Sequence, residues 1–308
     1  MKICYLFPGQ GTQKPGMLRE LGDELQNAAE VFDTAEAVTG RDVRQLCLTA
    51  SDAELRLTEN TQLAVTAMNL AYFTILKKQG VVPDIVMGHS LGQFSALYAA
   101  GVTTMEDTFR IVQKRAELMS QTEQSGALCT VLGLLPQQVA EICRRIDPEG
   151  QKLTVALHNT EKQVVVGGTE ELVAQAEAAS KLAGALRTVP VKVSNAFHTP
   201  LMKDMEVRFT DFLQSIELHE PTCRIILNCK GDDADSVDDI REDIIRQCCH
   251  TVHWYDGLLR LLETPDLVPV EVGIGKTMAG MLRNTEPKLT TYLASNPRQR
   301  MQLVQLAR

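Results

Sequence analysis

The chain has 308 residues, of which 44% are hydrophobic and 23% are charged, and its formal net charge is −8 at pH 7. This length allows one large core or two domains, and the acidic balance disfavours a nucleic-acid-binding protein, which usually has a basic surface. No apolar run approaches the roughly 20 residues of a membrane-spanning helix, and the N-terminus lacks the features of a signal peptide, so we expect no membrane partner.

The first part of the chain alternates short apolar runs with longer helical patterns, which is typical of a parallel α/β architecture. Residues 3–7 and 85–87 have the composition of buried strands, and each run ends at a glycine-containing turn. Residues 57–80 and 103–121 have the periodicity, capping residues and charge placement of helices.

A different order of elements occupies residues 125–191. Strand and helix patterns follow one another as β-α-β-β-α-β, at residues 127–134, 136–146, 153–159, 163–168, 169–184 and 185–191. This order is that of a ferredoxin-like unit. We therefore predict an α/β protein whose large, hydrolase-like parallel-sheet domain comprises residues 1–124 and 192–308, with an inserted ferredoxin-like subdomain at 125–191.

The most informative short motif is Gly88-His89-Ser90-Leu91-Gly92, which has the form Gly-x-Ser-x-Gly between a predicted strand and a predicted helix. In that context the glycines permit a tight turn that exposes the serine hydroxyl at a helix N-terminus, where free N–H groups favour negative charge. We interpret Ser90 as a nucleophile and the backbone N–H of Leu91 as an oxyanion donor. The alternative is a glycine-flanked turn in which Ser90 only caps the helix.

A serine nucleophile needs a base, and the chain has six histidines. The side chain of His89 is expected to leave the turn in another direction and to be structural, and His158 and His219 have no local feature that indicates catalysis. His198 lies just before Thr199 and Pro200, which predict the start of a helix. It would be fixed in position yet able to face a cleft, so it is the preferred candidate.

Two further patterns are weighed and rejected. His250 and His253 could bind a metal from one helix face, but two imidazoles without a third ligand are a poor metal site. The segment "VGIGKT" has Val270 where a phosphate loop requires its first glycine. We therefore predict no metal site and no cofactor.

The glycine-rich segment Phe7-Pro8-Gly9-Gln10-Gly11 directly follows the first predicted strand. Such a turn at the carboxyl end of a parallel strand exposes backbone N–H groups. The N–H of Gln10 could meet that of Leu91 and complete an oxyanion hole. An ordinary strand-to-helix connection is the alternative.

Eight cysteines are scattered along the chain, and none belongs to a Cys-x-x-Cys pair. In a chain of this length without an export signal, such thiols are expected to stay reduced. We therefore expect a cytoplasmic protein.

Several motifs taken together resemble one family: "FPGQG", "GHSLGQ", the arginine of "IVQKRAELM", "AFHTPLM", "RQ…VHW" and "VEVGIGK". They resemble the malonyl-CoA:acyl carrier protein transacylases, which include the free-standing acyltransferases of polyketide assembly lines, and the resemblance spans nearly the whole chain. It implies that Ser90 becomes acylated and that His198 is its base. It also implies that Gln10 and Leu91 form the oxyanion hole and that Arg115 binds the carboxylate of a malonyl-type acyl group.

The same resemblance assigns further residues to the substrate site. A backbone carbonyl near Gln247 would orient the histidine, and Asn159 would line the cleft from the subdomain. Phe197, His89 and Gln93 complete the set expected around the substrate. The run of residues 196–198 is the form associated with malonyl rather than methylmalonyl transfer, whereas Gln93 replaces the glutamate that is usual in the family and so removes a charge near the nucleophile.

The implied reaction moves the acyl group from malonyl-CoA or a related acyl thioester to the phosphopantetheine thiol of an acyl carrier protein, in fatty-acid or polyketide biosynthesis, and we expect a monomer. Four alternatives stay open: a hydrolase that trims acyl groups from carrier proteins, a transacylase for an unusual unit such as aminomalonyl, an α/β-hydrolase esterase, and a non-catalytic docking protein. Arg115 favours transfer, because a planar guanidinium can bind a carboxylate with two hydrogen bonds.

Overall fold

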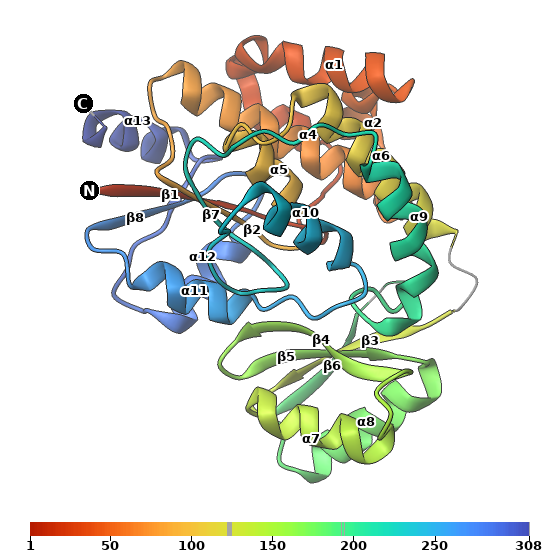
Figure 1. Cartoon of the computed structure of the whole chain (residues 1–308). Coiled ribbons are helices and arrows are strands. Elements are labelled where there is room, and N and C mark those ends of the chain that lie inside the picture. Colours follow the sequence, from red (N-terminus) through yellow and green to blue (C-terminus); the bar gives the residue numbers. More distant parts are fainter. Residues whose placement is uncertain (122–124, 192, 194, 308) are drawn as a thin grey trace.

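The larger sheet is parallel and has five strands in the order β7-β2-β1-β8-β9 in the computed structural model, which describes residues 1–121, 125–191, 193 and 195–307 (Figure 1). The bounds are β1 Lys2–Phe7, β2 Ile85–Gly88, β7 Arg224–Ile226, β8 Leu267–Glu271 and β9 Tyr292–Leu293. The predicted strands at 3–7 and 85–87 are confirmed. Because Phe7 pairs in register with Gly88, the turns that follow β1 and β2 lie side by side at one edge of the sheet.

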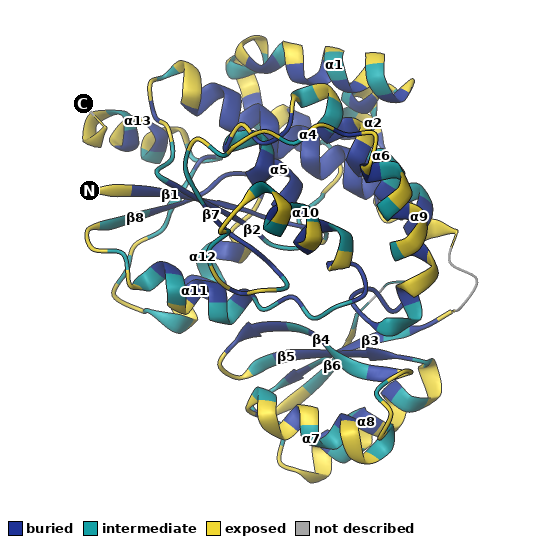
Figure 2. Cartoon of the chain, in the orientation of Figure 1, coloured by how far each residue is buried: buried dark blue, intermediate teal, exposed yellow. Residues whose placement is uncertain are grey.

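Helices cover this sheet, and one of them lies in the interior. Helix α4 (Thr58–Lys78) is buried at every residue from 60 to 76, so it is a core helix rather than an amphipathic surface helix. Figure 2 shows buried residues along α4 and the central strands, and exposed residues on the outer faces of α1 and α13. The other helices of this part are η1 Met17–Ala28, α1 Ala29–Thr39, α2 Val43–Thr49, α3 Asp52–Leu55, α5 Gly92–Ala99, α6 Met105–Ser120, η2 Pro200–Met202, α9 Lys203–Leu213, α10 Val237–Arg246, α11 Trp254–Leu262, α12 Thr277–Thr285 and α13 Pro297–Leu306.

The smaller sheet is antiparallel, with strand order β4-β5-β3-β6, and it carries two helices on one face (Figure 1). Its elements are β3 Ala127–Leu132, α7 Pro136–Ile146, β4 Leu153–Thr160, β5 Gln163–Gly168, α8 Glu170–Leu182 and β6 Arg187–Val191. The order along the chain and across the sheet confirms the ferredoxin-like unit. The domain boundaries at 124/125 and 191/192 stay a prediction, because residues 122–124 and 192 lie outside the described residues.

A backbone contact ties the small sheet to the large domain. The N–H of His158 on β4 donates to the carbonyl of Val252, 2.9 Å away, and the N–H of Val252 donates to the carbonyl of Ala156, 3.0 Å away. The loop before α11 thus runs as an added bridge beside β4. Within the described residues, no helix combines the length and apolar character that crossing a membrane requires.

Candidate active site

The turn that carries Ser90 joins β2 to α5 and is unusually tight. Ser90 has φ 50°, a left-handed conformation that is uncommon for a residue other than glycine. A Cβ atom at Gly92 would lie 2.1 Å from the carbonyl oxygen of Phe7, and one at Gly88 would lie 2.1 Å from the carbonyl carbon of Gly92. Only glycine fits at both positions, so the two glycines let the serine turn pack against the loop after β1.

Three hydrogen bonds that involve side chains support this turn. The N–H of Ser90 donates to Asn228 Oδ1 (2.7 Å), and Asn228 Nδ2 donates to the carbonyl of Gly88 (2.7 Å). Gln247 Nε2 donates to the carbonyl of Ser90 (3.0 Å). A left-handed serine persists only when its surroundings fix it, and these side chains do so.

His198 faces the serine hydroxyl. Its Nε2 lies 2.8 Å from Ser90 Oγ, and its Nδ1 lies 2.7 Å from the carbonyl oxygen of Gln247. Because a carbonyl oxygen can only accept, Nδ1 carries the hydrogen and Nε2 presents its lone pair to the serine. Burial, with a smaller contribution from the charge of Arg115, lowers the pKa of His198 from 6.5 to about 3, so the imidazole is neutral near pH 7.

The loop that presents His198 was predicted in outline but not in detail. His198 has φ 63° and its N–H donates to the carbonyl of Cys248 (2.8 Å). Thr199 occupies the N-cap position of η2, as expected. Its hydroxyl donates to the carbonyl of Ala196 (2.6 Å) instead of accepting from a helical N–H, so it fixes the loop rather than the helix.

Arg115 brings a buried positive charge to the same place. Its side chain donates to Gln62 Oε1 (2.8 Å), Ser90 Oγ (3.2 Å) and Gln247 Oε1 (3.1 Å), and its guanidinium carbon lies 5.4 Å from the centre of the Phe94 ring. Only 1% of its surface is exposed, and no carboxylate among the described residues pairs with it. A buried guanidinium bound by neutral oxygens favours an anionic ligand.

These groups open onto a cavity of about 430 Å³ between the two sheets. Seven of the ten predicted site residues line it: Gln10, His89, Ser90, Leu91, Arg115, Phe197 and His198. The opposite wall comes from the small sheet and is apolar, with Leu128, Leu157, Val189, Pro190 and Val191.

The other three predicted residues lie behind the lining. Asn159 Oδ1 accepts from His89 Nε2 (2.8 Å), so Asn159 acts on the cavity through His89, whose ring also meets Trp254 edge-on. Gln247 accepts a hydrogen bond from Arg115 through Oε1 and donates one to the carbonyl of Ser90 through Nε2, so it supports both Arg115 and the serine turn.

Gln93 points into the protein interior rather than into the cavity. Its Nε2 donates to Asp243 Oδ2 (2.7 Å) and its Oε1 accepts from Gln247 Nε2 (2.6 Å). Burial raises the pKa of the Asp243 carboxyl. A glutamate at position 93 would set two buried carboxyl groups against each other, so the glutamine suits this interior and its effect on the nucleophile is indirect.

Three polar residues that support the serine turn, Arg115 and Gln93 were not predicted from the sequence. Asn228 holds the serine turn, Gln62 orients Arg115, and Asp243 accepts from Gln93 and from the backbone of residues 228–230. A signal existed for Asn228, because it follows the apolar run 225–227 at the carboxyl end of a parallel strand, where polar residues gather at sites. Gln62 is hidden in a core helix and Asp243 in a charged helix.

The sequence analysis rejected a metal site at His250 and His253 and a phosphate loop at "VGIGKT". The local structure of both segments also differs from what those sites require. Residues 247–253 form a turn and a bridge instead of a helix, so His250 and His253 do not share a helix face: His250 approaches Glu206 (4.0 Å) and His253 approaches Asp256 (2.9 Å). After "VGIGKT", the buried Glu271 carboxylate accepts from the N–H of Ala279 (2.9 Å) in the first turn of α12. A carboxylate thus already lies where a phosphate loop would bind its anion.

The parallel sheet, the strained serine turn and the histidine facing it define the class of serine-dependent acyl-transfer enzymes. The chain belongs to the acyl transferase domain family, whose model matches residues 4–298. It is 31% identical over 298 residues to the malonyl CoA-acyl carrier protein transacylase of Bacillus subtilis, covering 96% of this chain and 94% of that one.

Solved structures agree over the whole length. The malonyl CoA-acyl carrier protein transacylase of Coxiella burnetii superposes with a TM-score of 0.95 at 27% identity, covering 99% of this chain and 97% of that one. The malonyl-transacylase solved in complex with its type II polyketide synthase acyl-carrier protein superposes with a TM-score of 0.93 at 29% identity, covering 99% of this chain and 100% of that chain. The resemblance drawn from the motifs is therefore confirmed.

Proposed function

We propose that this enzyme moves a malonyl group from malonyl-CoA through an acyl-Ser90 intermediate to the phosphopantetheine thiol of an acyl carrier protein, in fatty-acid or polyketide biosynthesis. One observation carries the proposal: Ser90 Oγ lies within hydrogen-bond distance of both the His198 imidazole (2.8 Å) and the Arg115 guanidinium (3.2 Å). A nucleophile beside a base and a buried cation suits an acyl group that carries its own carboxylate.

In the first half-reaction, Ser90 Oγ attacks the thioester carbon and its proton passes to His198 Nε2. The C–O bond forms, the C–S bond breaks, and the departing thiolate takes the proton from His198. The hydrogen bond from Nδ1 to the Gln247 carbonyl keeps the ring in the tautomer that this transfer needs. The backbone N–H groups of Gln10 and Leu91 stabilise the tetrahedral oxyanion, by about 3 kcal/mol per donor.

Arg115 selects the substrate class. The malonyl carboxylate pairs with a guanidinium whose partners among the described residues are all neutral. A neutral acyl group would leave that buried cation uncompensated, at a cost of about 2–5 kcal/mol.

In the second half-reaction, the carrier thiol enters the same cavity and gives its proton to His198. The new C–S bond forms, the C–O bond to Ser90 breaks, and the serine regains its proton. Thiol must compete with water at this step, and the apolar wall from the small sheet limits the water that reaches the ester. All eight cysteines, each within the described residues, are free thiols, which supports a place in the cytoplasm.

Intact-protein mass spectrometry tests the proposal. The purified chain is exposed to malonyl-CoA or acetyl-CoA and then to a phosphopantetheinylated carrier protein. A malonyl adduct that is absent from Ser90→Ala and that moves to the carrier supports transfer. An adduct that persists in Ser90→Ala contradicts the role of Ser90. An adduct that is lost to water but not to the carrier contradicts transfer and favours a hydrolase.

A further inference from the structure

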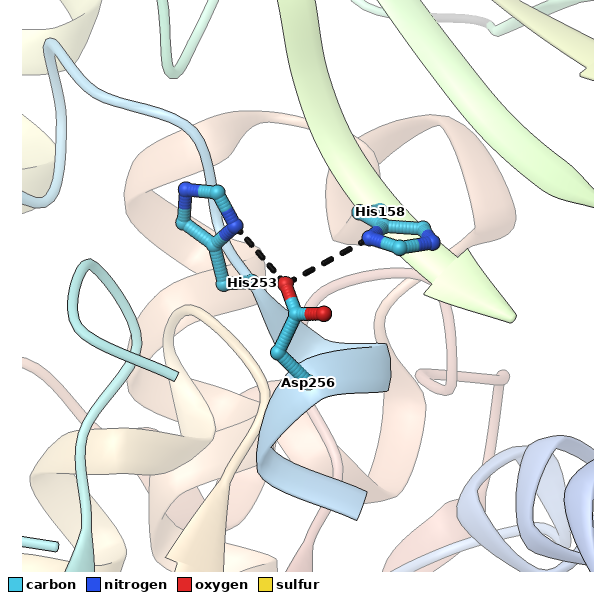
Figure 3. A group of neighbouring side chains, drawn as sticks. All are labelled: His158, His253 and Asp256. Carbon is cyan, nitrogen blue, oxygen red and sulfur yellow. Dashed lines mark hydrogen bonds and ion pairs between the residues drawn. The ribbon is translucent and has the colours of Figure 1, made fainter. Parts of the chain in front are cut away.

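A second cluster of chemically active side chains lies away from Ser90, at the junction of the two sheets. His158 comes from β4, and His253 and Asp256 come from the start of α11 (Figure 3). The Nδ1 atoms of both imidazoles face the same carboxylate oxygen, Asp256 Oδ2, at 3.5 Å from His158 and 2.9 Å from His253. From the sequence we predicted no metal site, because the pair His250 and His253 lacked a third ligand; the fold instead places His158 and Asp256 beside His253.

The three ligand atoms are spaced as a small metal ion requires. One ligand atom from each residue lies within 4.8 Å of the other two. Ligands about 2.0–2.2 Å from zinc in a tetrahedral site stand about 3.3–3.5 Å apart from one another. Shifts of an ångström or so would bring all three to that spacing, and the half-exposed side chains of His253 and Asp256 have the freedom to make them.

The residue types in this cluster are also those that bind zinc-class ions. Two imidazoles and one carboxylate suit zinc and its transition-metal neighbours, and do not suit magnesium or calcium, which prefer oxygen ligands alone. A cavity of about 420 Å³, lined among others by His158, Thr251 and His253, gives an ion access from solvent.

We propose that His158, His253 and Asp256 bind one divalent transition-metal ion of the zinc class, with water completing the coordination. The ion takes the place of the hydrogens that the two Nδ1 atoms now direct at one carboxylate oxygen, and each neutral imidazole then carries its hydrogen on Nε2. It joins β4 to α11 and adds a coordinate link beside the backbone bridge between Ala156 and Val252. The site is thus a link between the two sheets that is separate from the acyl-transfer chemistry.

Zinc titration of the full chain against a chromophoric chelator tests the proposal, with cobalt absorption as a report on ligand type. The informative variants are His253→Gln and Asp256→Asn. His250→Gln is the matched control, because the His250 side chain is 42% exposed and that of His253 is 41% exposed, yet only His253 belongs to the cluster. We expect one zinc per chain, affinity at least about tenfold weaker in both variants, and no change in the control.

Cobalt distinguishes this site from adventitious binding by the eight thiols. Visible ligand-field bands without a thiolate charge-transfer band support imidazole and carboxylate ligands. A thiolate band, less than one equivalent of tight zinc, or equal affinity in His253→Gln and His250→Gln would overturn the proposal. Circular dichroism confirms that each variant is folded; where one is not, the cobalt spectrum of the unmodified chain decides. Millimolar magnesium should not displace the zinc.

Discussion

The two walls of the main cavity differ in kind. On the side of the large sheet, Ser90, His198 and Arg115 are held by hydrogen bonds that reach back to Gln247 and Asn228. On the side of the small sheet the lining is made of apolar side chains. We infer that the difference separates two tasks: the large domain positions the proposed reacting groups, and the ferredoxin-like unit limits water. Changes to the first wall should therefore alter the chemistry of transfer, and changes to the second should alter its fidelity.

The largest effect is expected when the base is removed. His198→Ala should slow both malonyl loading and transfer to the carrier by roughly 10²–10⁴-fold, because among the described residues only His198 offers an acceptor to the serine hydroxyl. Rapid-quench kinetics of each half-reaction measures this. His219→Ala, an exposed histidine elsewhere on the chain, is the control and should leave both rates unchanged. A normal loading rate in His198→Ala would mean that another group is the base.

Removal of the buried cation should change the choice of substrate more than the ability to acylate. Arg115→Ala should weaken malonyl loading by roughly 30-fold or more, corresponding to at least about 2 kcal/mol, while acetyl loading falls less. The ratio of kcat/KM for malonyl-CoA and acetyl-CoA measures this. Arg115→Lys keeps the charge without the paired hydrogen bonds and should fall between. An unchanged ratio would show that Arg115 does not read the carboxylate.

Loss of the support beneath the serine should have a moderate effect. Asn228→Ala leaves the Ser90 N–H without its partner, and we expect kcat for loading to fall roughly tenfold, since an unpaired buried group costs about 1–3 kcal/mol. KM should change little because Asn228 does not line the cavity. Cys229→Ala, a truncation at the next residue of the same loop, is the control. A change confined to KM would contradict a positioning role.

On the apolar wall, a polar substitution should raise hydrolysis without slowing acylation. Val191→Thr keeps the shape of the side chain but offers water a hydrogen-bond partner, so the malonyl-enzyme should hydrolyse a few-fold faster. Decay of the adduct without carrier measures this. Val82→Thr, at a position 57% exposed and outside the cavity lining, should have no effect. If acylation slowed while hydrolysis stayed constant, the division between the two walls would be wrong.

The smallest change is expected in the acid limb of the pH profile. His198 has its pKa lowered from 6.5 to about 3, so the neutral base persists as pH falls. kcat/KM for loading should therefore stay nearly constant from pH 7 to 5, where a base of pKa 6.5 would lose roughly 25-fold. The free energy of unfolding should nevertheless fall as pH decreases below 6.5, because the unfolded chain then binds a proton that the folded one does not. An inflection in kcat/KM near 6.5 would contradict the buried neutral base.

Local sequence patterns predicted most of the fold and seven of the residues that line the main cavity. The alternation of strand and helix patterns predicted both sheets. Ser90 could be identified because a nucleophile elbow needs two glycines within a five-residue motif. The three-residue strand β7 was not predicted, being too short to show a pattern. No helix carries both His250 and His253 on one face, because the segment between them pairs with β4 through Val252 and cannot also coil.

Contacts between distant residues could not be predicted in the same way. Asn228 reaches a serine 138 positions earlier in the chain, and Arg115 meets a glutamine 132 positions later. The zinc-class cluster has the same origin, since His158 comes from a strand far upstream of its partners. Such contacts cannot be predicted from residue spacing along the chain, because they form only when the fold brings distant strands side by side.

One glutamine has a consequence for how this enzyme could diverge. Gln247 touches the base through its carbonyl, and the guanidinium, the serine turn and Gln93 through its amide. The choice of acyl group and the rate of transfer therefore both depend on the position of Gln247. A descendant that adapts to uncharged acyl chains by replacing Arg115 would leave Gln247 Oε1 without its donor, so the route to a new specificity should pass through paired substitutions rather than one.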